Sequence, residues 1–219
     1  MAWPTAMRSG TVLAIFVGLG LTLVAGVYEL TRDRILAAEQ QVVLDRLEAV
    51  LPTGYDNEPA DAHFERPSPI AGGPPARVYP AYAGERYLGA AIEAETPEGY
   101  AGPIRLLVGI DAEQQVVAVR VISHRETPGL GDGIEASRSD WIEAFAGRTL
   151  GDPEAAEWKL RGDGGAFDGI TGATVSARAV VAAVRQVLEA VAADPEAFRG
   201  EPPETAAGGE DNGEASGEA

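Results

Sequence analysis

The chain contains no cysteine, only two histidines and a single lysine, Lys159. Without thiolates it cannot form disulfides, thiolate-ligated iron–sulfur clusters or Cys-based zinc sites. The two histidines, His63 and His124, lie far apart in sequence, so we expect no metal site. If this chain carries electrons, an organic cofactor has to carry them.

Positive charge is also scarce. Lys and Arg together number 17 against 34 Asp and Glu, which gives a formal net charge of −17. Nucleic-acid binding needs clustered Lys and Arg to contact phosphates, so we expect no nucleic-acid partner. A length of 219 residues predicts one globular domain with appendages.

Residues 11–28 form an uncharged, mostly apolar run. With the residues up to 30 it is long enough to cross a bilayer as a helix, so we predict a short N-terminal arm over 1–10 and a transmembrane helix over 11–30. A cleaved signal peptide is the alternative, since Val24 and Gly26 offer a small-residue cleavage site. The length of the run and the uninterrupted helical pattern beyond it favour an anchor in the lipid bilayer.

An amphipathic helix is predicted over residues 31–54. Apolar residues recur there at helical spacing, with charges between them, and Pro52 and Gly54 end the pattern. We interpret the apolar stripe as core that packs on the following domain. Its members are Ile35, Val42 or Val43, Leu47 and Val50.

Residues 55–199 are predicted to form one α+β domain with an antiparallel sheet and flanking helices. After a loop over 55–75, alternation and turn residues predict two hairpins. The predicted strands are 77–82, 86–95, 104–110 and 116–123, followed by a helix at 134–145, a short strand at 157–160 and a helix at 175–193. Residues 200–219 carry six acids and no basic residue, which predicts a disordered tail.

The most informative segment is Asp168-Gly169-Ile170-Thr171-Gly172-Ala173-Thr174, which runs directly into a predicted helix. A helix N-terminus exposes backbone N–H groups and a partial positive charge, so it suits a phosphate. A threonine hydroxyl at this position can be esterified to such a phosphate. The sequence leaves open that Thr171 or Thr174 is an ordinary N-cap, and Ser176 is a rival hydroxyl nearby.

A second segment, His124-Arg125-Glu126-Thr127-Pro128-Gly129-Leu130-Gly131, follows a predicted strand. Pro128-Gly129 is a strong turn signal, and a loop at this position needs no function. This segment nevertheless resembles the Glu-Thr-Pro-Gly-Leu-Gly segment in the family of the G subunit of the Rnf electron-transport complex. The first segment resembles the flavinylation motif Asp-x-x-[Ser/Thr]-Gly-Ala-Thr. Further matches, in the same order and spacing, are Gly99–Ile104, Ser139–Ile142 with Phe145, and Gly164–Asp168.

The resemblance covers about residues 15–191 and implies FMN as cofactor. In proteins with the flavinylation motif, the last threonine carries FMN through a phosphoester bond, and here that residue is Thr174. We expect the remaining cofactor-binding residues on the same two segments, and no catalytic residue or metal ligand. They are Glu126, Thr127, Gly129 and Leu130 on one, and Asp168, Thr171, Gly172 and Ala173 on the other.

The resemblance also implies the protein's place in the cell. It implies an electron-transfer subunit, not catalytic alone, of a complex that links ferredoxin and NAD to ion translocation. The N-terminal arm would be cytoplasmic, and the FMN-binding domain would lie on the periplasmic side of a bacterial inner membrane. The expected partners are the other Rnf subunits and a flavin transferase.

Two rivals stay open from the sequence. One is the C subunit of the sodium-translocating NADH:quinone reductase, or a regulatory flavin domain, within the same domain family. The other is a membrane-anchored scaffold without redox function, in which Thr174 only begins a helix. The size of the chain, the predicted long helix and the Glu126 loop favour the G-subunit family over the first rival. The second rival stays open, and absence of flavin from the protein made in its native host would favour it.

Overall fold

The structure is a computed structural model that describes residues 10, 13–14, 16–22 and 45–201. It consists of two units, Met1–Asp45 and Arg46–Ala219. In the first unit, residues 16–22 are helical. Within the described residues, none of the helices combines the length and the apolar character needed to cross a bilayer. Most of the predicted transmembrane helix, residues 31–44 of the amphipathic helix and the tail beyond residue 201 lie outside the described residues.

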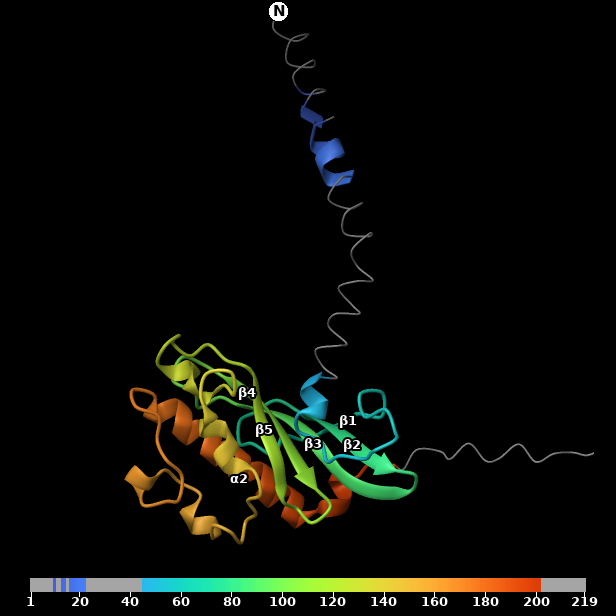
Figure 1. Cartoon of the computed structure of the whole chain (residues 1–219). Coiled ribbons are helices and arrows are strands. Elements are labelled where there is room, and N and C mark those ends of the chain that lie inside the picture. The colour runs from blue at the N-terminus through green and yellow to red at the C-terminus, as the bar shows by residue number, and fades with distance from the viewer. Residues whose placement is uncertain (1–9, 11–12, 15, 23–44, 202–219) are drawn as a thin grey trace, which may run out of the picture. The chain divides into compact units, whose positions relative to one another are not determined.

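The second unit is built on a five-stranded antiparallel sheet in which each strand pairs with the next (Figure 1). The two predicted hairpins are confirmed, as β2 with β3 and β4 with β5. The strand β1 was not predicted, because its three residues lie inside the expected loop. The strands are β1 (Phe64–Arg66), β2 (Ala76–Ala83), β3 (Arg86–Thr96), β4 (Ile104–Asp111) and β5 (Val116–Ser123).

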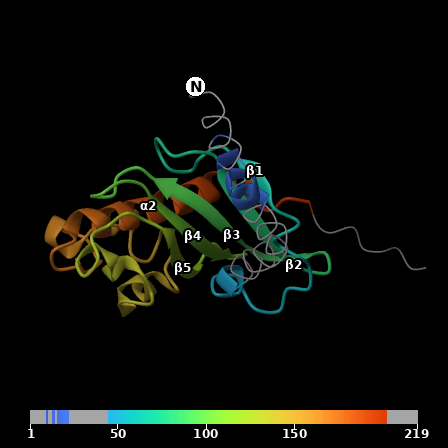
Figure 2. The ribbon, with the colours of Figure 1, turned by 90° about the horizontal axis from the view of Figure 1, so that it is seen from above.

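One face of the sheet packs against the helix α2 (Thr174–Ala193), which lies along it in both views (Figures 1 and 2). Because side chains alternate between the faces of a strand, every second residue of β4 points into this core. Ile104, Leu106, Val108 and Ile110 are each at most 2 % exposed. The predicted apolar stripe of α2 is buried against them, and its members are Val180, Val184, Val187, Leu188 and Val191.

The opposite face of the sheet is covered in part by residues just after the start of the second unit. Leu47, Val50 and Leu51 are buried against alternating residues of the strands, so the predicted role of Leu47 and Val50 as core is confirmed. Gly109 permits this packing, since a Cβ there would collide with the backbone of Val50. Another part of this face carries the charged residues Arg77, Glu93, Glu95 and Arg105.

Two predicted elements of the second unit are wrong. Residues 134–145 form no continuous helix but two 3-10 turns, η1 (Gly131–Ile134) and η2 (Asp140–Phe145). Between them the chain is extended at Ser139, whose side chain accepts a hydrogen bond from Trp141 N at 3.2 Å and starts the second turn. Short polar side chains therefore override the apolar periodicity in this segment.

The predicted strand at 157–160 is also wrong. The short turns η3 (Ala155–Glu157) and η4 (Arg161–Asp163) flank this segment, and Leu160 makes a single parallel bridge with Phe167. The pattern of buried Trp158 and Leu160 imitates a strand, but no neighbouring strand is available to pair with it among the described residues. A last turn, η5 (Pro195–Phe198), follows α2.

Candidate functional site

A pocket of about 410 Å³ lies at the start of α2, within the size range of about 300–1,000 Å³ that is typical of small-molecule sites. Three segments that are distant in sequence form it: the loop after β3, the loop after β5 and the entry into α2. The lining residues are Tyr100, Glu126, Thr127, Leu130, Gly131, Gly172, Ala173, Thr174, Val175 and Ser176.

A tight turn delivers the chain into α2. The Ala173 N–H donates to Ile170 O at 3.0 Å, and Gly172 at the third position has φ +82°. A positive φ there is typical of a type II turn, which favours glycine. A Cβ on Gly172 would also lie 3.2 Å from Leu130 Cδ2. The turn therefore leaves Thr171 exposed and places Thr174, also exposed, in the first turn of the helix.

The N-terminus of α2 has no side-chain cap. Ala173 is the N-cap residue, no side chain among the described residues accepts a hydrogen bond there, and the first turn holds no acid. The alternative that Thr171 or Thr174 caps the helix is therefore wrong. The free N–H groups and the helix dipole favour an anion at this end, next to the Thr174 hydroxyl.

Exposed apolar side chains surround the same pocket. Tyr100 is 73 % exposed, Leu130 54 % and Val175 42 %, and within residues 46–201 no other large apolar residue is classed as exposed. All three line the pocket. Exposed apolar surface gathered around a concavity is typical of a binding site.

The floor of the pocket is polar and buried. Glu126 is 4 % exposed and Ser176 is 1 % exposed. The Ser176 hydroxyl donates to Glu126 Oε2 at 2.7 Å, and Ala101 N–H donates to Glu126 Oε1 at 3.3 Å. The rival hydroxyl of Ser176 is thus inaccessible and already bonded, whereas those of Thr174 and Thr171 are exposed.

A histidine supports Glu126 from behind. The Glu126 backbone N–H donates to His124 Nδ1 at 3.0 Å, while His124 Nε2 lies 2.6 Å from Glu135 Oε1. The hydrogen bond with His124 holds the pKa of the Glu135 carboxyl below its usual range, and Ser137 contributes in the same direction. Glu135 is therefore a carboxylate near neutral pH.

Six of the nine predicted cofactor-binding residues line this pocket, and three do not. Gly129 and Thr171 are exposed beside it. Asp168 lies outside it, where its side chain pairs with Arg161 at 2.8 Å and its carbonyl accepts from Trp141 Nε1 at 2.7 Å. The six lining residues are Glu126, Thr127, Leu130, Gly172, Ala173 and Thr174.

Four lining residues lie outside the nine predicted cofactor-binding positions: Tyr100, Gly131, Val175 and Ser176. Tyr100 lies in the matching segment 99–104, and the other three adjoin or belong to the two motif segments. Their sequence neighbourhood was therefore a usable signal. Within residues 45–201 and the described part of the first unit, no group of three or more His, Asp or Glu forms a metal site.

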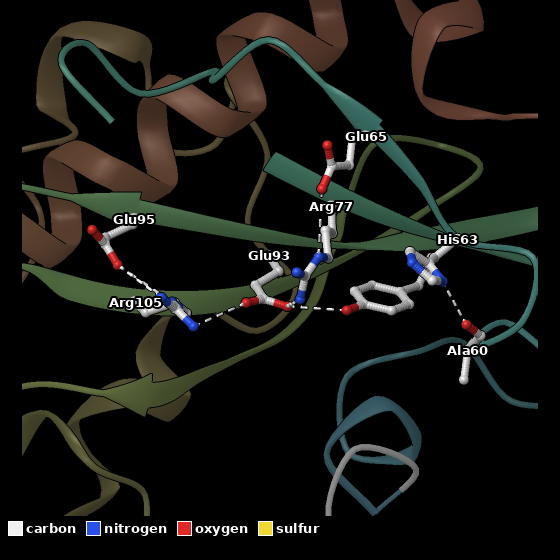
Figure 3. Close-up of polar contacts among 8 residues, drawn as sticks. Ala60, His63, Glu65, Arg77, Glu93, Glu95 and Arg105 are labelled. Atoms are coloured by element: carbon white, nitrogen blue, oxygen red, sulfur yellow. Dashed lines mark hydrogen bonds and ion pairs between the residues drawn. The ribbon is translucent and has the colours of Figure 1, made fainter. Parts of the chain in front are cut away.

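A second concavity, of about 260 Å³, lies on the charged part of the sheet's opposite face. We call it the strand groove and define it by Glu65, Arg77, Glu93, Glu95 and Arg105 (Figure 3). Arg77 lies between Glu65 and Glu93, at 3.9 and 4.0 Å. Arg105 lies between Glu93 and Glu95, at 3.6 and 3.3 Å.

The strand groove is internally paired. Its ion pairs connect neighbouring strands, and Tyr79 Oη donates to Glu93 Oε2 at 3.0 Å. Burial and the neighbouring Glu93 carboxylate raise the pKa of Tyr79 to about 12. Each arginine already faces two carboxylates, so the groove offers no free positive charge to an anionic ligand.

The regions of this chain that are similar to known proteins include the residues that line the pocket. Residues 99–189 match the FMN-binding domain family, and residues 1–50 match the RnfG N-terminal region. The chain is 41% identical to the G subunit of an ion-translocating oxidoreductase complex from Pseudomonas aeruginosa (strain UCBPP-PA14), over 93% of this chain and 96% of that protein. The protein with the same description from Aliivibrio fischeri (strain ATCC 700601 / ES114) is 40% identical over 84% and 89%.

A further relative with this description, from Yersinia pestis, is 43% identical over 83% of this chain and 88% of its own. The similarity thus extends over nearly the whole length of each relative. The chain belongs to the family of the G subunits of ion-translocating oxidoreductase complexes and carries an FMN-binding domain.

Proposed function

We propose that this chain is a membrane-anchored electron-transfer subunit that holds FMN through a phosphoester on Thr174. FMN supplies a carrier of one or two electrons, and the chain has no cysteine that could ligate an iron–sulfur cluster instead. The observation that carries the proposal is an exposed threonine hydroxyl at an uncapped helix N-terminus. It opens onto a pocket bordered by exposed apolar residues.

The residues present fit both ends of FMN. The phosphate end needs positive potential, and the free N–H groups at the start of α2 supply it, stabilising an anion by about 0.3–1 kcal/mol. The ring end needs apolar walls, which Tyr100, Leu130 and Val175 provide. Gly172 keeps the attachment segment clear of side chains, and Thr127 adds a hydroxyl to the lining from the facing loop.

A covalent bond suits a pocket this open. A reversibly bound cofactor is lost by mass action where its free concentration is low. Attachment to Thr174 retains the cofactor while leaving one edge exposed for electron exchange. We assign no catalytic residue, because the described residues of the pocket bind and orient rather than transform a substrate.

The proposal also covers the membrane anchor, the cellular location and the partners of this domain. Residues 11–30 would anchor the chain in the inner membrane, and the domain over 55–199 would lie on the periplasmic side. There it would exchange electrons with other subunits of an ion-translocating complex, after a flavin transferase has loaded it. The relatives are described as subunits of such a complex, which supports this assignment.

Substitution of the two exposed threonines tests the attachment. The full chain would be produced with a flavin transferase, as wild type, Thr174→Ala and Thr171→Ala. In-gel fluorescence after denaturation and intact mass should show FMN on wild type and Thr171→Ala, and none on Thr174→Ala. Fluorescence retained by Thr174→Ala would refute the assignment. Wild type without flavin, beside an active transferase, would favour a scaffold without redox function.

A further inference from the structure

His124 is almost enclosed, with a side chain 11 % exposed, between the loop that lines the pocket and the turn η1. Its two ring nitrogens contact different segments. Nδ1 contacts the backbone N–H of Glu126 at 3.0 Å, and Nε2 contacts the Glu135 carboxylate at 2.6 Å. The imidazole thus connects the partly exposed carboxylate of Glu135 with the backbone of Glu126, in the loop that lines the pocket.

These contacts define where the proton of the ring lies. A backbone N–H only donates, so His124 Nδ1 has to accept and carries no proton. The carboxylate of Glu135 only accepts, so Nε2 has to carry the proton and donate. The two contacts therefore assign the ring proton of His124 to Nε2.

The other histidine has the opposite arrangement. His63 Nδ1 lies 2.6 Å from the carbonyl oxygen of Ala60 (Figure 3). A carbonyl oxygen only accepts, so Nδ1 of His63 has to donate. His63 therefore provides a comparison, within the same chain, for the position of the ring proton on His124.

The effect of His124 reaches the pocket through Glu126. Glu126 also joins three segments, because its carboxylate accepts from Ala101 and Ser176 while its backbone is held by His124. A Cβ on Gly131 would lie 2.7 Å from Glu126 Cβ, so the loop closes tightly around this side chain. Rotation of the Glu126 carboxylate away from the pocket would break these contacts.

We propose that His124 is a positioning residue that holds the Glu126 carboxylate in the pocket and thereby lowers the reduction potential of the bound cofactor. This inference rests on the proposed function. A fixed negative charge beside the pocket opposes the addition of an electron to a group bound there. Glu126 supplies that charge, and His124 and Glu135 hold it in place without lining the pocket themselves.

Several charged groups surround the imidazole. Glu135, which directly follows η1, faces Nε2, and the charge of Arg138 also lowers the pKa of the Glu135 carboxyl. Glu126 faces Nδ1 through its backbone N–H. Protonation of Nδ1 would therefore place a donor against the N–H of Glu126 and remove the acceptor that holds the loop.

The protonation state is tested with the full chain labelled with ¹⁵N-histidine and solubilised in detergent. Since the chain has only two histidines, two sets of ring signals are expected near neutral pH. His124 should show its proton on Nε2 only, and His63 should show a proton on Nδ1. Assignment follows from the variants His124→Asn and His63→Asn. A proton on Nδ1 of His124 would overturn the inference, whether or not flavin is attached.

The effect on potential is tested by redox titration of the loaded full chain after its flavin content has been measured. Glu126→Gln and His124→Ala should each shift the midpoint to a more positive value than in wild type. The double variant should match Glu126→Gln, because two residues acting through one charge do not add. His63→Ala, which removes the distant histidine, should leave the potential unchanged.

A variant that restores the potential distinguishes a positioning role of His124 from a merely structural role. In His124→Asn, the amide oxygen takes the place of Nδ1 and accepts from the Glu126 N–H, so the potential should return close to that of wild type. His124→Ala with an unchanged potential, or a double variant with a further shift, would overturn the inference. Wild type without flavin would refute the proposed function instead, while the histidine signals would still report on the network.

Discussion

The pocket at the start of α2 and the strand groove are both concave and both contain carboxylates, yet their polar groups are used differently. In the strand groove, every arginine faces two carboxylates and Tyr79 donates to Glu93. In the pocket, the first turn of α2, where Thr174 lies, has no side-chain cap among the described residues. Satisfied polar groups hold strands together, whereas groups that lack a partner are free to bind a ligand.

The two regions also differ in where their apolar surface lies. The apolar part of the sheet face beside the strand groove is covered by Leu47, Val50 and Leu51. Around the pocket, Tyr100, Leu130 and Val175 remain exposed. A folded domain normally keeps such patches small unless they bind something, so the difference supports the pocket as the functional region.

Among substitutions that leave Thr174 in place, the largest loss of FMN should come from Gly172→Ala. Both Gly172 and Gly129 have positive φ, at +82° and +79°, but only a Cβ on Gly172 would meet Leu130, at 3.2 Å. Each substitution should cost about 1–2 kcal/mol of unfolding free energy from backbone strain. Only Gly172→Ala should also lower the FMN-to-protein ratio severalfold, measured by absorbance. Equal flavin content in the two variants would contradict the role of the turn.

Ser176→Ala should destabilise the pocket without removing a lining apolar group. The buried Glu126 carboxylate would lose its 2.7 Å donor, which costs about 1–3 kcal/mol. Ser137→Ala is the matched control, since Ser137 donates to Glu135 at 3.0 Å but is exposed. Urea unfolding should show the larger loss for Ser176→Ala. FMN should remain attached in both variants, and its loss from Ser176→Ala alone would point to Ser176 as the acceptor.

Disruption of the strand groove should have a small effect on stability and none on the cofactor. Arg105→Ala removes two ion pairs whose arginine side chain is 44 % exposed, so the expected loss is at most about 1 kcal/mol. Added salt should shrink the difference further. Urea unfolding measures the expected loss of stability, and the flavin content shows whether the cofactor is retained. A large loss of FMN would show that the two regions are coupled. It would contradict the view that the strand groove only holds strands together.

The effect of Tyr79 ionisation on stability should be confined to alkaline pH. The pKa of Tyr79 is raised from 10.0 to about 12 in the folded protein. Between these values the unfolded chain binds fewer protons than the folded one, so stability falls as pH rises. In Tyr79→Phe this contribution disappears, and the decline of unfolding free energy over that interval should be shallower. An unchanged slope in urea titrations would contradict the contact with Glu93.

Much of this arrangement could be predicted from local patterns. The β2–β3 and β4–β5 hairpins follow from alternating side chains and turn residues, and α2 follows from its apolar stripe. Two of the three pocket segments coincide with the two motif segments, and the resemblance named the cofactor that the family comparison supports. These features depend on neighbours in sequence, which is why they could be predicted.

Other features depend on packing between distant segments. The bond between Ser176 and Glu126 joins residues 50 positions apart, and no local pattern shows that the Ser176 hydroxyl is buried and already bonded. Tyr100 reaches the pocket only because the loop after β3 folds beside α2. Asp168 belongs to the motif, yet Arg161 and Trp141 hold it away from the pocket. The 134–145 segment breaks into turns because of side-chain hydrogen bonds that periodicity does not register.

The most direct test of the attachment is fragmentation mass spectrometry of the tryptic peptide Gly162–Arg178 from the flavin-loaded chain. This peptide contains all three candidate hydroxyls, Thr171, Thr174 and Ser176. We predict that the mass of an FMN phosphoester appears only in fragments that contain Thr174. Addition on Thr171 or Ser176, or an unmodified peptide from protein that retains flavin after denaturation, would contradict the proposed attachment.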